Sequence, residues 1–217
     1  GAGDRAIGFD PASREFELIL CSGPKIRDRL VHETGVSPDK IFIVGYPKFD
    51  TVSHEKPGLS FDTGGRKIVV YNPHPSPHLS SWFKDGQAVL DFFLHHDEYF
   101  LIFAPHVMLF ERKFVLTIDR LSFARTGKIA QKYYDAPNIH IDLGSPASTD
   151  MTYTNAADIY LGDVSSQIYE FLYTPRPCLF MNSHAVDYKN DKNYAHWEAG
   201  PVIEGPHMLA DGLRQAI

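Results

Sequence analysis

Two serines, Ser165 and Ser166, lie where the sequence predicts that a strand turns into a helix. An apolar run at residues 159–161 predicts a buried strand, Asp163 follows in the turn, and apolar residues recur at helical spacing in residues 168–172. The first N–H groups of a helix and the positive end of its dipole favour a bound anion, and two hydroxyls add donors. We therefore expect Asp163, Ser165 and Ser166 to bind a nucleotide phosphate. The alternative is that Asp163 or Ser165 only caps the helix.

Glu170 lies one helical turn beyond Ser166 in this prediction. A carboxylate at that place can accept hydrogen bonds from both hydroxyls of a nucleotide ribose. The alternative is an exposed helix residue with no ligand. We expect Glu170 to belong to the nucleotide-binding residues.

His106 is the predicted catalytic residue. It directly follows the apolar run at residues 100–104, which predicts a strand. A histidine there can accept a proton near neutral pH, or stabilise phosphate charge when it is protonated. Asn72 and His74 follow another predicted strand, at residues 67–71, and we expect them to bind the nucleotide or its phosphates. The alternative for each histidine is a loop residue that bonds the backbone.

These side chains need a scaffold that brings the ends of several strands together. From Arg66 onward, apolar strand-like runs alternate with helical patterns, which is typical of an α/β fold with a Rossmann-like, doubly wound parallel sheet. In such a sheet, ligands bind beyond the carboxyl ends of the strands. The predicted strands are residues 16–21, 41–44, 67–71, 100–104, 138–142, 159–161 and 177–181. The predicted helices are a long one after Ser80 or Ser81, and residues 118–134, 151–157 and 206–217, with an irregular stretch at 183–205.

The chain is predicted to contain two domains. Residues 1–55 read as one strand–helix–strand unit at the end of an N-terminal domain, and the polar residues 56–65 read as a linker. Residues 66–205 then form a nucleotide-binding domain, and residues 206–217 form a terminal helix.

Composition excludes several function classes. The 217 residues carry a net charge of −6 with scattered basic residues, so the sequence has no nucleic-acid footprint. No apolar run approaches the roughly 20 residues that cross a bilayer. Cys21 and Cys178 lie in apolar runs, which predicts buried thiols and a cytoplasmic protein. Histidines and cysteines show no metal-ligand spacing, so we expect no metal site.

Three stretches together resemble the CDP-glycerol glycerophosphotransferases of teichoic acid synthesis. The first runs from Leu20-Cys21-Ser22-Gly23-Pro24 to Gly45-Tyr46-Pro47-Lys48-Phe49-Asp50, with Lys48 at a position where the family has arginine. The second is Phe103-Ala104-Pro105-His106, and the third runs from Gly162-Asp163-Val164-Ser165-Ser166 to Tyr169-Glu170-Phe171. Their order and spacing span residues 16–182.

The resemblance implies the donor-binding half of a GT-B fold. The implied reaction moves glycerol phosphate from CDP-glycerol to a hydroxyl of a cell-envelope polymer, with a nucleotide diphosphate as substrate and no cofactor. His106 would be catalytic, Ser165 and Ser166 would hold the pyrophosphate, and a loop of Tyr46, Pro47 and Lys48 would lie near the cleft.

The resemblance also implies partners. These are a nucleotide-activated donor, a polyol or glycan acceptor that is expected to be lipid-linked, and a missing N-terminal domain of the same protein. Residues 1–5 would be the remainder of a family motif whose histidine lies just upstream, and this chain alone would be inactive. The expected location is the cytoplasm, with peripheral association at the inner face of the plasma membrane.

Two other functions remain open from the residues. One is a GT-B glycosyltransferase or sugar-nucleotide epimerase that uses a UDP-sugar. The other is a nucleotide-binding or interaction module without catalysis.

Overall fold

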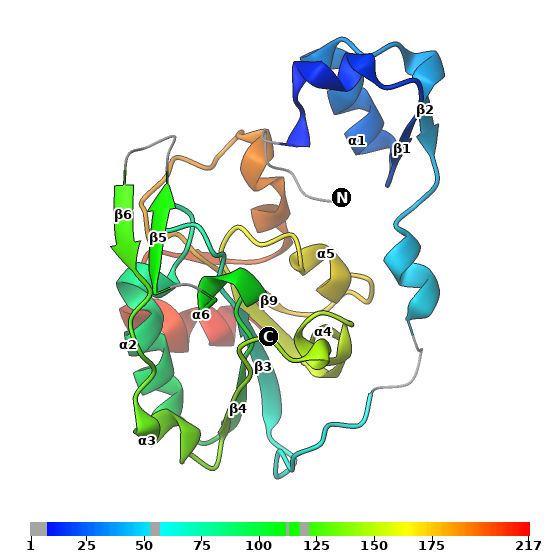
Figure 1. Cartoon of the computed structure of the whole chain (residues 1–217). Helices are drawn as coiled ribbons and strands as arrows, with labels where there is room; N and C mark the ends of the chain where they lie inside the picture. Colours follow the sequence, from blue (N-terminus) through cyan, green and yellow to red (C-terminus); the bar gives the residue numbers. More distant parts are fainter. Residues whose placement is uncertain (1–7, 53–56, 112, 118–121) are drawn as a thin grey trace. The chain divides into compact units, whose positions relative to one another are not determined.

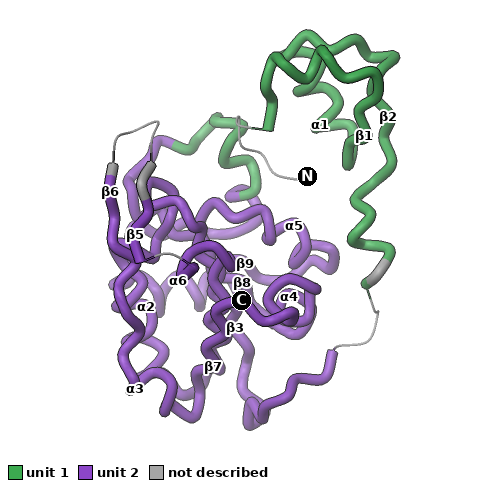
Figure 2. The backbone as a smooth tube through the Cα atoms, in the orientation of Figure 1, with its two compact units in different colours: residues 1–54, 188–196 green, residues 55–187, 197–217 purple. Residues whose placement is uncertain are grey.

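The computed structural model describes residues 8–52, 57–111, 113–117 and 122–217. Two compact units make up the chain (Figure 2). Unit 1 consists of Gly1–His54 and Tyr188–His196, and unit 2 consists of Glu55–Asp187 and Trp197–Ile217. The predicted motif remainder at residues 1–5 lies outside the described residues.

A six-stranded parallel sheet forms the centre of unit 2, and Figure 1 labels its strands β3, β4 and β9. The strand order is β10-β9-β8-β3-β4-β7. Every neighbouring pair in it is parallel. The prediction of a Rossmann-like, doubly wound α/β fold is confirmed. The strands are β3 (Lys67–Asn72), β4 (Tyr99–Phe103), β7 (Ile139–Ile141), β8 (Ile159–Gly162), β9 (Cys178–Met181) and β10 (Val202–Ile203).

Helices cover both faces of this sheet. Neighbouring residues of a strand point to opposite faces, so each strand packs against helices on both sides. Val69 and Tyr71 share a buried cluster with residues of α2 (Trp82–Leu94), α3 (Gln131–Tyr134) and α6 (Leu209–Ala216). On the other face, the Tyr160 ring lies 5.6 Å from that of Phe171 in α5 (Ile168–Phe171), which neighbours α4 (Thr152–Ala156). Burial on both faces explains why these strands are continuous apolar runs rather than alternating ones.

The helix after Ser165 is shorter than predicted. It begins at Ile168, with Gln167 as the residue before it, and has four residues. The Ser165 Oγ accepts the Gln167 backbone N–H at 3.3 Å, a capping bond in the turn before the helix, as the alternative interpretation of Ser165 expected. The expected start at Ser165 or Ser166 is therefore wrong, and both serines lie in the turn between β8 and α5.

The predicted helix at residues 118–134 is also wrong for most of its length. The structure has an antiparallel hairpin of β5 (Phe114–Thr117) and β6 (Ser122–Arg125), and helix only in α3. Aromatic and β-branched residues such as Phe114, Val115 and Phe123 favour strands over helix. Residues 118–121 lie outside the described part. The irregular stretch predicted at 183–205 contains the short strand β10.

Unit 1 is a small strand–helix–strand unit. Its strands β1 (Ile19–Cys21) and β2 (Ile41–Ile43) are parallel, and α1 (Pro24–Arg29) connects them and continues as a π-helical turn, Leu30–Thr34. The segment Tyr188–His196 also belongs to this unit, although the sequence assigned it to the nucleotide-binding domain. Lys192 Nζ lies 3.1 Å from Glu33 Oε1, an ion pair that no local sequence pattern reveals.

The predicted burial of both cysteines is confirmed, since Cys21 and Cys178 are buried and free of a disulfide. Burial raises the pKa of the Cys178 thiol to about 12. Among the helices of the described residues, none combines the length and hydropathy needed to span a membrane.

Candidate functional site at the carboxyl edge of the sheet

The chain order of the sheet reverses between β3 and β8. From β3 the chain builds outward through β4 to β7, and from β8 it builds the other way through β9 to β10. Asn72, the last residue of β3, stands opposite Gly162 at the end of β8. In open α/β sheets, ligands bind beyond the carboxyl ends of the strands at this point of reversal. The predicted residues of unit 2 therefore lie at the edge where a nucleotide would dock.

Asp163 shapes this edge by joining two loops. Its Oδ2 accepts the backbone N–H and the hydroxyl of Ser81 at 2.7 and 2.9 Å, and its Oδ1 accepts the N–H groups of His74 and Val164 at 2.9 and 2.7 Å. The residue is 1% exposed. Burial raises the pKa of this carboxyl, while the bonds from Ser81, Val164 and His74 oppose the rise. With four protein donors around its carboxylate, Asp163 holds the loop after β3 in place.

Asn72 joins the ends of two adjacent strands. Its Nδ2 donates to the Ala104 carbonyl at 2.6 Å, at the end of β4. Its buried Oδ1 has no hydrogen-bond partner among the described residues. A buried acceptor without a donor is costly, so the site retains capacity for a donor from water or ligand.

His74 and His106 form a pair at the ends of β3 and β4, with ring centroids 6.4 Å apart. The Nδ1 of His74 accepts the Ser76 N–H at 3.0 Å, and the Nδ1 of His106 accepts the Met108 N–H at 3.3 Å. The loops themselves are joined, because the His106 N–H donates to the Pro73 carbonyl at 3.1 Å.

The hydrogen bonds at Nδ1 determine which ring nitrogen of each histidine can carry a proton. A ring nitrogen that accepts an N–H carries no proton, so each neutral ring carries its proton on Nε2. Burial lowers the pKa of the His106 imidazole, which favours the neutral form near pH 7. A neutral His106 can therefore offer its Nε2–H to an anion, with the His74 ring beside it.

The turn after β8 contains Ser165 and Ser166 in different surroundings. Ser165 is buried, and Ser166 is exposed. The Gln167 side chain donates to the Ser148 carbonyl at 3.0 Å, which fixes this turn against the loop after β7. Ser166 is thus the hydroxyl that solvent and a ligand can reach. Glu170 is buried, so it is not the exposed helix residue of the alternative interpretation.

The third predicted group, Tyr46, Pro47 and Lys48, belongs to unit 1. Tyr46 precedes the short helix Pro47–Thr51, and its ring meets that of Phe49 edge-on at 5.0 Å. These residues thus belong to a different unit from the histidine pair. Their predicted place near a cleft stays a prediction.

Several residues at this edge were missed by sequence reasoning. Ser81 appeared only as a helix cap, yet its hydroxyl bonds Asp163. His184, after β9, has its Nε2 2.9 Å from the Ser80 carbonyl, and the indole of Trp197 donates to the Asp163 carbonyl at 2.8 Å. The rule that polar residues gather at strand ends would have found His184, whereas no local signal marks Trp197.

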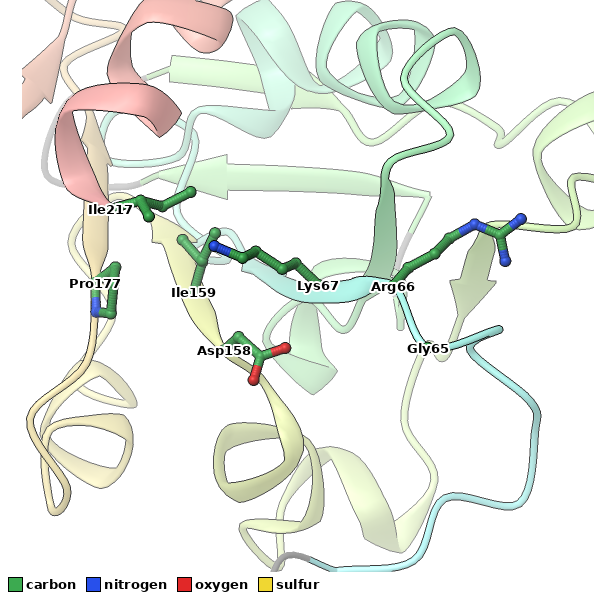
Figure 3. A pocket seen from close by; sticks show the side chains of 7 residues that line it. All are labelled: Gly65, Arg66, Lys67, Asp158, Ile159, Pro177 and Ile217. Carbon is green, nitrogen blue, oxygen red and sulfur yellow. The ribbon is translucent and has the colours of Figure 1, made fainter.

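A pocket of about 370 Å³ lies at the opposite edge, where β3 and β8 begin (Figure 3). None of the predicted site residues lines it. Its lining is Gly65, Arg66, Lys67, Asp158, Ile159, Pro177 and Ile217. Within the part of the chain that the structure describes, no group of three or more metal-ligating side chains gathers.

Comparison with known proteins confirms the resemblance predicted from the sequence. The chain is 23% identical over 229 aligned positions to a teichoic acid glycerol-phosphate transferase of Staphylococcus aureus (strain NCTC 8325 / PS 47). The alignment covers 96% of this chain and 53% of the relative. The chain thus spans about half the length of the curated relative that it matches. No protein-family model matches it.

Solved structures share the fold. The wall teichoic acid polymerase TagF aligns with a TM-score of 0.63 and 14% identity, over 97% of this chain and 51% of TagF. A TagF variant soaked with CDPG aligns with a TM-score of 0.62 and 16% identity, over 97% of this chain and 49% of the variant. The glycotransferase of kitacinnamycin aligns with a TM-score of 0.53 and 12% identity, over 92% of this chain and 46% of that one.

Proposed function

We propose that this chain is the nucleotide-binding half of a transferase that moves glycerol phosphate from CDP-glycerol to a hydroxyl of a cell-envelope polymer. The observation that carries the proposal is the pair His74 and His106 at the carboxyl edge of the sheet, at the ends of β3 and β4 beside the point where the sheet order reverses. It gains support from similarity along 96% of the chain to a teichoic acid glycerol-phosphate transferase.

The proposed reaction is a displacement at phosphorus. The acceptor oxygen forms a bond to the phosphorus that carries glycerol, and the bond from that phosphorus to the bridging oxygen breaks. CMP leaves with the electron pair, and the hydroxyl proton passes to a base. Negative charge on the phosphoryl oxygens is stabilised by donors set in place beforehand.

Side chains of unit 2 would supply these donors. The Nε2–H group of His106 and the hydroxyl of exposed Ser166 suit phosphate oxygens, and His74 would bind beside them at the end of β3. Asp163 positions the His74 loop, and Glu170 would accept the ribose hydroxyls. The reaction in this form needs no metal or cofactor.

The base and the acceptor of the proposed reaction are not assigned to residues of this chain. Because the chain spans about half of its relative, we assign the base and the polyol or glycan acceptor, lipid-linked in this proposal, to an N-terminal domain of the same protein. We place the enzyme in the cytoplasm, at the inner face of the plasma membrane.

Calorimetric titration of the chain with CDP-glycerol, CDP, UDP-glucose and UDP tests the donor. We expect CDP-glycerol to bind and Ser166→Ala to weaken binding by about 1.5–3 kcal/mol, the scale of a hydrogen bond to a charged group. Ser60→Ala, an exposed serine of the same unit, is the matched control. Preference for UDP-glucose would favour the glycosyltransferase or epimerase alternative.

Turnover by the full-length protein tests His106. His106→Ala should lower kcat by about 10²-fold with little change in nucleotide affinity if the imidazole acts in the transition state. His95→Ala, an exposed histidine at the end of α2, is the control. Wild-type turnover in His106→Ala would return this residue to a loop role, and nucleotide binding with no turnover by the unmodified protein would favour a non-catalytic module.

A further inference from the structure

The β5–β6 hairpin lies outside the six-stranded sheet (Figure 1). It exposes a pair of phenylalanines, Phe114 and Phe123. Phe114 is 50% exposed and Phe123 is 66% exposed. Their rings stack with centroids 5.1 Å apart and planes 23° apart. Phe114 stands opposite Arg125, so by the alternation of strand residues Phe114, Phe123 and Arg125 share one face of the hairpin.

The hairpin and its flanks are basic in an acidic chain. Residues 111–128 contain five basic and two acidic residues, a net charge of +3, while the whole chain carries −6. Exposed cations flank the two phenylalanines in the sequence, at Lys113, Arg125 and Lys128, and Arg125 shares their face of the hairpin.

The base of the hairpin is fixed to the core of unit 2. The Trp82 indole donates to the Thr126 carbonyl at 2.8 Å, and the Thr126 hydroxyl donates to the Leu109 carbonyl at 3.2 Å. The Phe110 ring meets the Trp82 ring at 5.1 Å. These contacts hold the base of the hairpin without involving the rings of Phe114 or Phe123.

We propose that the β5–β6 hairpin binds an anionic phospholipid surface. Phe114 and Phe123 enter the interfacial region, while Lys113, Arg125 and Lys128 face the phosphate groups. Aromatic rings beside cations match a surface that is apolar beneath and negative above. A soluble polyanion would engage the cations but would leave the two rings in water.

The hairpin lies close to the candidate site in the sequence. His106 follows β4 (Tyr99–Phe103) by three residues, and β5 begins eight residues after His106 at Phe114, with the short helix Val107–Leu109 between them. A lipid-bound hairpin would thus hold the carboxyl edge of the sheet near the membrane surface. Lipid binding is independent of the proposed function, because it needs neither nucleotide nor turnover.

Sedimentation with vesicles tests the proposal on the 217-residue chain. We expect binding to phosphatidylcholine vesicles that contain roughly 30% phosphatidylglycerol, and little binding to phosphatidylcholine alone. The double substitution Phe114→Ser and Phe123→Ser should lower the partition coefficient about 10-fold or more, because two rings no longer leave water. Lys113→Glu should lower it about fivefold or more.

Phe42→Ser is the matched control, since Phe42 is 53% exposed in unit 1. It should bind vesicles as the unmodified chain does, and an equal loss in Phe42→Ser would overturn the assignment to the hairpin. Unchanged binding by the double phenylalanine variant, together with competition by soluble polyphosphate, would show a polyanion site and not a lipid site.

A second measurement applies if the double phenylalanine variant folds poorly. Phe123→Trp keeps a large ring on the hairpin, and its added fluorescence should be quenched by brominated lipid, whereas that of Phe42→Trp should not. Absence of quenching at position 123 in a vesicle-bound chain would contradict insertion.

Discussion

The two parallel sheets of this chain differ in how they use similar residues. In unit 2, Leu161 in β8 is 0% exposed and lies between β3 and β9, with helices on both faces. In unit 1, Leu20 in β1 is 60% exposed beside its register partner Phe42 in β2. Parallel strands normally have both faces covered. A local apolar run is therefore sufficient to form a strand, whereas the burial of that strand depends on how many layers of helix and sheet surround it.

Unit 1 exposes several large apolar side chains, namely Phe16, Leu18, Leu20, Phe42, Ile43 and Val44. Leu20 and Phe42 are register partners on one face of the strand pair, whereas Ile43 pairs with buried Cys21 on the other face.

The largest expected effect is a truncation in the central sheet. Leu161→Ala should lower the free energy of unfolding by about 2–5 kcal/mol, because it leaves a cavity in a fully packed core. Leu20→Ala should change it by less than about 0.5 kcal/mol, since the side chain is already in water. Urea denaturation of both variants measures the contrast. Equal losses would mean that the β1–β2 face is covered in the chain alone.

A smaller effect is expected from the buried carboxylate of unit 2. Asp163→Ala removes the acceptor for Ser81, His74 and Val164, and should lower the free energy of unfolding by about 1–3 kcal/mol. Thermal denaturation measures it.

Asp28→Ala is the counterpart in unit 1, because this carboxylate forms an exposed pair with Arg27. Its loss should cost no more than about 0.5 kcal/mol. A cost for Asp28→Ala that equals that of Asp163→Ala would break the contrast between the units.

The smallest expected effect is on the stability of unit 1 at acidic pH. The bond from Arg29 lowers the pKa of Glu33 from 4.5 to about 2, against burial, with a further contribution from Lys192. A depressed carboxyl pKa stabilises the fold above pH 4.5, and that contribution is lost as pH falls from 4.5 toward 2. Glu33→Gln should flatten the pH dependence of unfolding in this window, by no more than about 1 kcal/mol.

Hydrogen exchange would locate this effect. Amides of Tyr188–His196 should exchange faster in Glu33→Gln, because the Lys192 ion pair that holds this segment in unit 1 is removed. If the pH dependence of unfolding is the same for Glu33→Gln and for the unmodified chain, the ion pairs of Glu33 contribute nothing to stability in solution.

Local patterns were sufficient for most of the central sheet and for part of the site. Apolar runs predicted β3, β4, β8 and β9 to within a residue or two, and the cap and spacing predicted α2. Placing polar residues at strand ends put Asn72, His74, His106 and Asp163 at one edge, because parallel strands carry their carboxyl ends to the same side. These conclusions follow from sequence alone, since each depends on residues close together in the chain.

The sequence by itself determined the order of the strands' apolar runs and the chemistry available at their ends. The tertiary structure decided the rest: that Asp163 bonds Ser81, 82 residues earlier, that His74 and His106 form a pair, and that Lys192 joins Glu33 across 159 residues. It also decided that Phe114–Thr117 pairs with Ser122–Arg125 as antiparallel strands, because cross-strand pairing competes with local helix propensity. Contacts between distant residues depend on packing in three dimensions, and no periodicity within one segment encodes them.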